Sequence, residues 1–402
     1  MKHLFFCLLL VLIASCKREG CTDPKAVNYD YKVKIADNSK CIYKEYTADN
    51  NTVVIDFGQY SCSSFADFHF KKIPGATVDY RIKCFVRFGG KIIIDPGVTI
   101  EFTEDAGMRF DKVVSINGTI DSVINFIPVN SYWRGLEFFG YSFPDTVNVH
   151  YLNVKNAGNP QTTSDLSFKY WGITFITNGN YNITNIQVDN CINGGVLFHT
   201  TSFDNDVYSI IFDSVTISNC EVPLKINHYA LANKFNSLSL GNNTSPEVIL
   251  PLRSMGLDSN IFFSNYGVPF HLTTHESSNN SITLSSVDLN ISAGCDFVMG
   301  QNAAITCNSS FNCIGNVTDS ITFIGEQNTS NFWKGFILSF PSIDFVRQEN
   351  VTNSNNSNMI LGSGFITNSI IKNGSTNCGI WSTQPINVTG TQAIGVTTLI
   401  CP

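Results

Sequence analysis

Apolar and polar residues alternate in short runs along most of this chain. In the run 98–102 (VTIEF), the apolar side chains share one face of an extended strand, and the polar side chains occupy the other face. In the run 108–110 (MRF), Arg109 is the outward residue between two apolar ones. The pattern predicts many short β-strands with one buried face each. The glycines that punctuate these runs are Gly97, Gly107, Gly118, Gly135 and Gly140.

A long segment of this pattern occurs twice. Residues 91–140 return in degraded form about 200 residues later. The matched positions are Gly97 with Gly294, Gly118 with Gly315, Phe126 with Phe323, and Trp133-Arg134-Gly135 with Trp333-Lys334-Gly335. A repeat built from strands and turns predicts a solenoid, in which successive units stack on one another. No Asn-Gly hairpin pattern is sustained, so consecutive strands are not expected to form hairpins.

A shorter pattern, apolar-x-apolar-x-Asn-small, recurs at intervals of about 30 residues, in the segments 152–157, 186–191 and 215–220. This interval fits one coil of a β-helix with a loop of variable length. Asparagine at the turn tolerates left-handed backbone and can hydrogen-bond to the neighbouring coil. Cys191 and Cys220, which follow that asparagine, would then stack inside the solenoid.

Three segments together resemble the right-handed parallel β-helix repeat proteins that bacteria secrete, within the pectate-lyase-like solenoid superfamily. They are Gly90 to Phe102, Ile116 to Thr119, and Trp133-Arg134-Gly135. The resemblance implies an all-β, right-handed parallel β-helix over residues 80–400. We expect two tandem segments, 91–245 and 246–402, joined near Asn242 to Asn265. Residues 48–90 are expected to form an irregular cap, because the first coil of a solenoid otherwise exposes its core.

Composition supports an all-β surface protein and excludes one class of partner. Only 14% of the 402 residues are charged, whereas 12% are aromatic, including 31 phenylalanines. Helical proteins use more Ala, Glu, Lys and Leu than this chain does. The net charge of −7 argues against nucleic acid as a partner, because nucleic-acid binding needs a basic surface.

Residues 1–15 predict a signal peptide. An apolar run from Leu4 to Ala14 follows an early lysine and is too short to span a bilayer. The segment Ile13-Ala14-Ser15-Cys16 resembles the lipobox of bacterial lipoproteins, which implies that Cys16 carries the lipid anchor. Lys17-Arg18-Glu19 resembles the export tag of surface lipoproteins in Bacteroidetes. These resemblances imply an outer-membrane lipoprotein displayed on the cell surface.

Residues 16–47 are predicted to be an anchor and a cysteine-bounded spacer. The segment Gly20 to Tyr43 resembles a short module of secreted Bacteroidetes proteins, which implies a loop closed by Cys21 and Cys41. A crosslink over a loop of this length contributes roughly 3 kcal/mol. The other pairs that we expect are Cys62 with Cys84 and Cys378 with Cys401.

The remaining cysteines are predicted to be buried thiols. Of the 13 cysteines, Cys7 leaves with the signal peptide and Cys16 is lipidated, which leaves an odd number. Five occupy inward positions of the pattern, where cysteine behaves as a small apolar residue. They are Cys191, Cys220, Cys295, Cys307 and Cys313. Neither the cysteines nor the histidines show zinc-ligand spacing, so no metal or other cofactor is expected.

One loop offers candidate carboxylates for catalysis. Asp204 and Asp206 lie in the segment 200–207, and Asp189 and Asp213 lie on the neighbouring coils. Glycoside hydrolysis needs two carboxylates across the scissile bond, and calcium prefers oxygen ligands of this kind. The simpler interpretation is a solvated loop without catalytic or calcium-binding function.

Aromatic residues recur at the expected coil boundaries and are candidates for stacking on sugar rings. They are Tyr132, Trp133, Tyr170, Trp171 and Trp333. The structural alternative is a tryptophan folded over the edge of the coil, which the nearby glycines favour.

Four short segments look like the O-glycosylation acceptor sequence of Bacteroidetes. The acceptors would be Ser122, Thr146, Ser214 and Ser320, each preceded by aspartate. Asp-Ser is also ordinary turn chemistry before a strand.

Taken together, the sequence predicts a lipid-anchored surface protein that binds a glycan or another surface protein through a rigid β-helical face. No segment carries a recognisable set of catalytic residues, so enzymatic activity is not favoured. Two rival hypotheses stay open, because a fold does not fix a function. One is a polysaccharide lyase or glycoside hydrolase on the same scaffold, and the other is a structural protein of the envelope.

Overall fold

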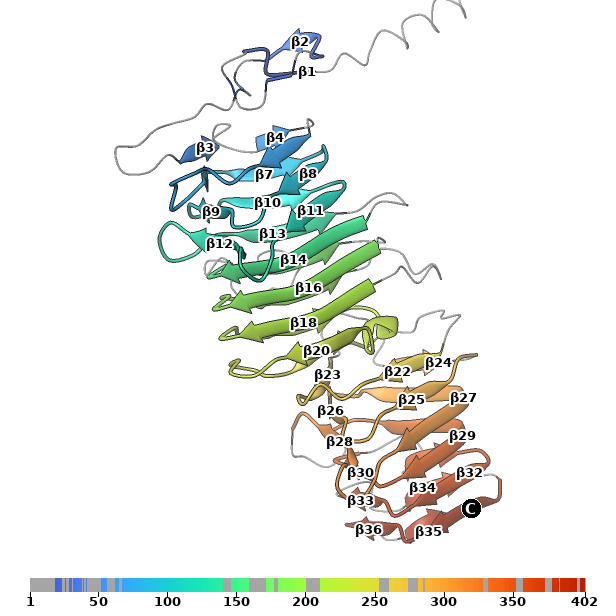
Figure 1. Cartoon of the computed structure of the whole chain (residues 1–402). Coiled ribbons are helices and arrows are strands. Elements are labelled where there is room, and N and C mark those ends of the chain that lie inside the picture. The colour runs from blue at the N-terminus through green and yellow to red at the C-terminus, as the bar shows by residue number, and fades with distance from the viewer. Residues whose placement is uncertain are drawn as a thin grey trace, which may run out of the picture.

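The structure is a computed structural model. It describes residues 19–23, 26, 29–30, 32–37, 39, 41, 52–55, 62–64, 67–139, 146–158, 171–176, 180–199, 210–252, 260–273, 281–284, 286–327, 332–351, 357–372, 378–382, 384–395 and 398–401. These residues form strands and turns, and they include the 3-10 turn η2 (Tyr229–Leu231). The strands stack into an elongated parallel β-solenoid (Figure 1). The predicted all-β solenoid fold is confirmed.

A 14-stranded parallel sheet, here called the long sheet, runs through the whole solenoid. Each coil adds one strand to it. Its strands are β4 (Cys62–Ser64), β7 (Phe85–Phe88), β10 (Gly107–Phe110), β13 (Gly135–Phe139), β15 (Ile173–Ile176), β17 (Val196–His199), β19 (Leu224–Ile226), β21 (Val248–Pro251), β23 (Phe270–Thr273), β26 (Asp296–Met299), β28 (Ile321–Gly325), β30 (Val346–Glu349), β33 (Ile370–Lys372) and β36 (Gln392–Ile394).

Two further parallel sheets close the solenoid. The first side sheet has 11 strands: β3 (Val53–Ile55), β5 (Phe68–Phe70), β6 (Tyr80–Ile82), β8 (Ile92–Ile94), β9 (Thr99–Phe102), β11 (Val114–Asn117), β12 (Ile124–Pro128), β14 (Thr146–Lys155), β16 (Asn180–Asp189), β18 (Ile210–Ser218) and β20 (Phe235–Ser239). The second side sheet has ten strands: β22 (Ile261–Phe263), β24 (Ser281–Leu284), β25 (Leu289–Ile291), β27 (Ala304–Ile314), β29 (Gly335–Asp344), β31 (Ser357–Leu361), β32 (Gly364–Thr367), β34 (Cys378–Ser382), β35 (Ile386–Thr389) and β37 (Thr398–Cys401).

Each side sheet bends to form two walls of the solenoid, and the long sheet forms the third. In β14 the bend is at Tyr151, in β16 at Asn185 and in β18 at Ser214, each with left-handed backbone (φ 50°, 55° and 55°). Before its bend β14 pairs with β11, and after the bend it pairs with β12. One residue of unusual backbone therefore turns a ten-residue strand through a corner, and after that residue the pairing resumes in the same register.

Stacked aromatic rings fill the interior along the long sheet. Phe110, Phe138, Phe175 and Phe198 come from consecutive coils, and their ring centroids lie 5.1, 5.0 and 4.6 Å apart. Phe297 and Phe323 stack in the same way at 4.6 Å in the later coils. In-register parallel pairing puts equivalent side chains about 4.8 Å apart, which is a favourable distance for offset stacking. The high phenylalanine content of the chain is thus explained by its core.

The predicted asparagine corners are confirmed. Asn156, Asn190, Asn219 and Asn242 all have left-handed backbone, with φ between 54° and 59°. The backbone N–H of each of the first three donates a hydrogen bond to a backbone carbonyl of the following coil. Asn190 Nδ2 also donates to Asn156 Oδ1 at 3.2 Å, which links the two coils through their side chains.

The sequence repeat corresponds to a structural repeat that is displaced by one wall. Gly97 and Gly294 have matching φ angles of 74° and 75°, and their amides donate to Ser122 and Asp319 in equivalent turns. However, β9, which follows Gly97, belongs to the first side sheet, whereas β26, which follows Gly294, belongs to the long sheet. The interval between the copies is therefore not a whole number of coils.

The side walls are interrupted between β20 and β22 (Figure 1). The long sheet continues through β19, β21 and β23. The interruption overlaps the junction predicted between Asn242 and Asn265. Because one sheet runs unbroken across it, the division into two segments stays a prediction.

The described part of residues 48–90 is more regular than the predicted cap, and whether it caps the solenoid stays a prediction. Strands β3, β4 and β5 pair in parallel with β6, β7 and β8, so this stretch is already a coil of the solenoid. Strands β3, β4 and β5 have only three residues each, which is too short for alternation to be recognised.

Two of the three predicted disulfides are confirmed. Cys21 bonds to Cys41 and Cys378 bonds to Cys401, with Cα–Cα distances of 4.8 and 6.0 Å. Cys84 is also disulfide-bonded, and β4, which contains Cys62, pairs with β7 immediately after Cys84. The five cysteines predicted to be inward are buried and free.

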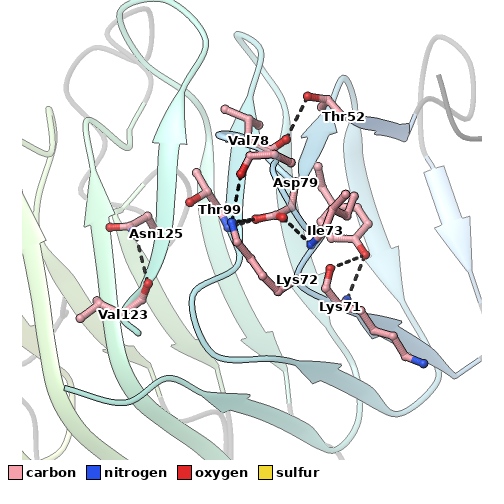
Figure 2. Close-up of polar contacts among 11 residues, drawn as sticks. Thr52, Lys71, Lys72, Ile73, Val78, Asp79, Thr99, Val123 and Asn125 are labelled. Carbon is pink, nitrogen blue, oxygen red and sulfur yellow. Dashed lines mark hydrogen bonds and ion pairs between the residues drawn. The ribbon is translucent and has the colours of Figure 1, made fainter. Parts of the chain in front are cut away.

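A buried carboxylate fixes the N-terminal coils (Figure 2). Asp79 is fully buried and accepts hydrogen bonds from the amides of Ile73 and Thr99, each at 2.7 Å, and from Lys72 Nζ at 2.8 Å. The neighbouring Tyr80 hydroxyl bridges the backbone of Lys71, and burial raises the pKa of Tyr80 to about 12. Asp79 thus ties a turn of one coil to a strand of the next.

We predict that Asp79→Ala destabilises this end of the solenoid by about 3 kcal/mol, because it leaves two backbone amides without this acceptor and removes the carboxylate partner of Lys72. Hydrogen exchange at the amides of β6 and β9 should become roughly 100-fold faster. Glu104→Ala, at an exposed position, is the control and should change exchange little. Equal exchange in the two variants would contradict the role of Asp79.

Candidate functional site

One outward row on the second side sheet combines aromatic and amide side chains. Register pairing aligns six residues of successive coils: Phe262, Asn290, Asn312, Ser342, Phe365 and Asn387. We call this set the Phe262 row. Phe262 is 46% exposed and Phe365 is 38% exposed, so both rings present a surface to solvent. Phe340, two residues before Ser342 on β29, is also exposed.

The polar members of the row are ordered by hydrogen bonds between coils. Asn312 Nδ2 donates to Asn290 Oδ1 at 2.9 Å, and Asn290 Nδ2 donates to the carbonyl of Ile261 at 3.4 Å. An amide has two N–H donors and two acceptor lone pairs, so each side chain keeps hydrogen-bonding capacity toward solvent. The row therefore offers fixed polar groups between two exposed rings.

Strand alternation explains why these phenylalanines point outward. In β22, Ile261 and Phe263 are buried and Phe262 lies between them. In β32, Phe365 precedes the buried Ile366. The Phe262 row was missed in the sequence. The available signal was the phase of alternation, because Phe262 and Phe263 are adjacent and only one of them can face the core.

The corresponding row on the first side sheet carries no aromatic residue. Its members are Thr99, Asn125, Asn153, Gln187, Thr216 and Ser239. Asn153 Nδ2 donates to Asn125 Oδ1 at 3.1 Å, as in the Phe262 row. The asparagine ladder is thus a general feature of the walls, and the exposed rings distinguish the second side sheet.

The tryptophans predicted to stack on sugars belong to the interior. Trp133, Trp171 and Trp333 are buried, so they offer no face to a ligand and that prediction was wrong for them. The indole of Trp133 stacks on Phe102 with ring centroids 4.0 Å apart, and its Nε1 donates to the carbonyl of Lys155 at 2.8 Å. Trp333 Nε1 donates the equivalent hydrogen bond to the backbone carbonyl of Glu349, also at 2.8 Å. Both indoles close a corner of the coil, as in the structural alternative.

The same prediction included two tyrosines, of which the structure describes one. Tyr132 is half-buried, and the burial that it has, together with the charges of Glu104 and Asp105, raises its pKa. Tyr170 lies outside the described residues.

The predicted carboxylate cluster is not assembled by its described members. Asp189 pairs in register with Lys155 and Ser218, whereas Asp213 pairs with Thr184 and Asn236 on the other side of the bend. Asp189 accepts hydrogen bonds from Ser218 Oγ at 2.9 Å and Asn219 Nδ2 at 2.7 Å, which is a structural role. Asp204 and Asp206 lie outside the described residues.

No group of three His, Cys, Asp or Glu side chains within the described part of the chain is arranged to hold a metal ion. The weak expectation of calcium near Asp204 and Asp206 therefore stays untested, because both residues fall outside that part.

The four predicted glycosylation acceptors all lie at strand ends or corners. Ser320 is exposed in the turn before β28, and Ser214 is exposed at the left-handed corner of β18. Ser122 and Thr146 are half-buried, one in the turn before β12 and the other at the start of β14. Modification of these residues stays a prediction.

A histidine between two glutamates lies on the outer side of the long sheet. His271 Nδ1 is 3.1 Å from Glu247 and its Nε2 is 4.0 Å from Glu326. Its register neighbours, Ile249 and Val298, are apolar. Burial is the largest effect and lowers the pKa of His271, but the hydrogen bond to Glu247 and both negative charges outweigh it, so the pKa is raised.

No protein-family model, curated protein or solved structure matches this chain. Among the described residues, no helix is long and apolar enough to cross a membrane.

We predict that the His271 ion pair makes stability depend on pH. Because the folded pKa is raised, its contribution is fully present below the unfolded pKa of about 6.5 and is lost as pH rises through the folded pKa. His271→Gln should flatten this part of the pH profile of the unfolding midpoint in urea, and Glu247→Gln should do the same. An unchanged profile in both variants would contradict the assignment.

Proposed function

We propose that this protein binds polysaccharide at the cell surface through the outer wall of its second side sheet. The observation that carries the proposal is the Phe262 row, where two exposed rings flank hydrogen-bonding side chains in fixed register. An aromatic face packs against the C–H face of a sugar ring, and amide or hydroxyl groups can bond to sugar hydroxyls.

The dimensions of the row suit an extended polymer. Phe262 and Phe365 are four register steps apart, which at the usual strand spacing amounts to about 19 Å along the solenoid axis. A chain of several sugars can lie across Asn290, Asn312 and Ser342 between the two rings. Because backbone hydrogen bonds hold the wall, little ordering entropy opposes binding.

Binding is favoured over catalysis by the placement of the carboxylates. Glycoside hydrolysis requires two carboxylates that flank one bond. The described members of the predicted cluster, Asp189 and Asp213, lie on different walls of the solenoid. Asp189 also accepts hydrogen bonds from its neighbours. A purely structural envelope protein is the remaining alternative, and it requires no exposed aromatic rings.

We also propose that the chain is held at the outer membrane by a lipid on Cys16. The support is the short apolar run before Cys16 and the resemblance of residues 13–16 to a lipobox. The disulfides Cys21–Cys41 and Cys378–Cys401 are in keeping with an oxidising compartment.

We predict that Phe262→Ala and Phe365→Ala each weaken polysaccharide binding about tenfold, since each removes one stacking surface. Affinity electrophoresis in gels that contain plant, algal or microbial polysaccharides measures the change. Ile211→Ala is a matched control, because Ile211 is 46% exposed on the first side sheet. Equal retardation of all three variants and the unmodified protein would contradict the proposal. Release of new reducing ends from any polysaccharide would show that the protein is an enzyme that cleaves it.

We predict that Cys16→Ser abolishes anchoring. Cells that produce the unmodified chain should incorporate radiolabelled fatty acid into it and retain it in the membrane fraction, and the variant should do neither. A variant that keeps its label would show that the lipid is attached elsewhere.

A further inference from the structure

Two buried cysteines occupy the same corner of consecutive coils. Cys191 follows Asn190 just after β16, and Cys220 follows Asn219 just after β18. The coils are joined at this corner, because the backbone N–H of Asn190 donates to the carbonyl of Ser218 at 3.0 Å. The two cysteines are 1% and 0% exposed. They are therefore neighbours in one row of the interior.

The two sulfur atoms face the same side of their coils. Each thiol donates to the backbone carbonyl two residues earlier in the chain, at 3.8 Å for Cys191 and 3.2 Å for Cys220. Each sulfur also lies against a glycine: a Cβ at Gly172 would be 2.6 Å from Cys191 Sγ, and one at Gly195 would be 3.5 Å from Cys220 Sγ. The two thiols share a hydrogen bond with each other. The pair is thus in direct contact.

The three other free thiols that the structure describes lie among apolar residues of the core. Cys307 and Cys313 are both on β27, and their register partners on the flanking strands are leucines and isoleucines. Burial raises the pKa of these two thiols and of Cys295. The hydrogen bond with Cys191 instead lowers the pKa of Cys220, so this pair contains the thiol that loses its proton more easily.

The spacing of the coils matches the reach of a disulfide. Neighbouring coils lie about 4.8 Å apart, and a disulfide spans Cα–Cα distances of about 4.4 to 6.8 Å. The bond between Cys21 and Cys41 has a Cα–Cα distance of 4.8 Å. Cys191 and Cys220 can therefore be joined without movement of the backbone.

We propose that Cys191 and Cys220 are a modification site, where oxidation forms a disulfide that links consecutive coils. The structure holds the reduced form. The oxidant is another disulfide, of a thiol–disulfide oxidoreductase or of glutathione, and it also supplies the other disulfides of the chain.

The reaction is two successive thiol–disulfide exchanges. One cysteine thiolate attacks the oxidant and forms a mixed disulfide, which releases the first thiol of the oxidant. The second thiolate attacks the cysteine sulfur of that mixed disulfide and releases the second thiol. The protein thus loses two protons and two electrons, and the oxidant becomes two thiols. Because both sulfurs are buried in the finished solenoid, the exchange takes place before these coils close.

The bond would staple one complete coil to its neighbour. The chain between the two cysteines includes β17 and β18, and β18 pairs with β16 along both of its walls. A crosslink that closes a loop of about 30 residues restricts the unfolded chain and so opposes opening of this part of the solenoid. The proposal concerns the middle of the solenoid and does not depend on polysaccharide binding by the Phe262 row.

The test identifies the pairing chemically. The full chain is reduced and unfolded in urea, refolded in a mixture of reduced and oxidised glutathione, alkylated, digested and analysed by mass spectrometry. We expect one linked pair of peptides that contains Cys191 and Cys220, while Cys307 and Cys313 are recovered alkylated. Recovery of Cys191 and Cys220 as alkylated thiols would overturn the proposal. Equal yields of bonds to the other buried thiols would also overturn it, because pairing would then not follow from contact between the two.

Hydrogen exchange tests the effect of the bond on the fold. Exchange at the amides of β16 and β18 should be roughly 100-fold slower in the oxidised protein than in protein refolded with reductant alone. The double variant Cys191→Ala/Cys220→Ala should show no such difference. Alanine fits the row, because Ala157 has the corresponding place in the preceding coil and is fully buried. The matched control, Cys307→Ala, should keep the difference, and its loss there or its persistence in the double variant would contradict the proposal.

Discussion

The structure depends on parallel in-register hydrogen bonding between each coil and the next. This pairing places equivalent residues of successive coils in line, so every position becomes a row with a single environment. Inside, the rows are phenylalanine stacks such as Phe110, Phe138 and Phe175. Outside, they are ladders of asparagine, such as Asn290 with Asn312. Both the stability of the fold and any repeated binding surface follow from this one constraint.

The in-register pairing restricts the choice of residue most strictly at the corners. A coil can turn between walls only if one residue accepts unusual backbone, and asparagine does so at low cost. Asn156, Asn190 and Asn219 fill this role in successive coils. The buried tryptophans complete the corners from inside, since the indole N–H of Trp133 binds a carbonyl of the coil beside it. Low charge and abundant asparagine are therefore structural properties before they are functional ones.

Much of this could be predicted from the sequence, because a row repeats its chemistry. The alternation in 98–102, the match of Gly97 with Gly294, and the asparagine corners all led to the observed solenoid. Cys191 and Cys220 were also placed correctly in the interior.

The candidate sites could not be predicted, because they depend on which residues become neighbours across coils of unequal length. Phe262 and Phe365 are brought into one row by the pairing of the strands from β22 to β32, and the sequence of neither segment alone predicts that pairing. The tryptophans were misjudged for a related reason, since a residue at a coil boundary can fold inward or outward. For Phe262, the alternation of side chains along its strand predicts an outward ring once Phe263 is known to be buried.

The central functional claim is that ligand covers the outer wall of the second side sheet. Hydroxyl-radical footprinting with and without a bound polysaccharide tests it directly, because exposed phenylalanines react in proportion to their accessibility. We expect protection of Phe262, Phe340 and Phe365, with Ile211 on the other side sheet unchanged. Protection confined to other walls, with these three rings still reactive, would contradict it.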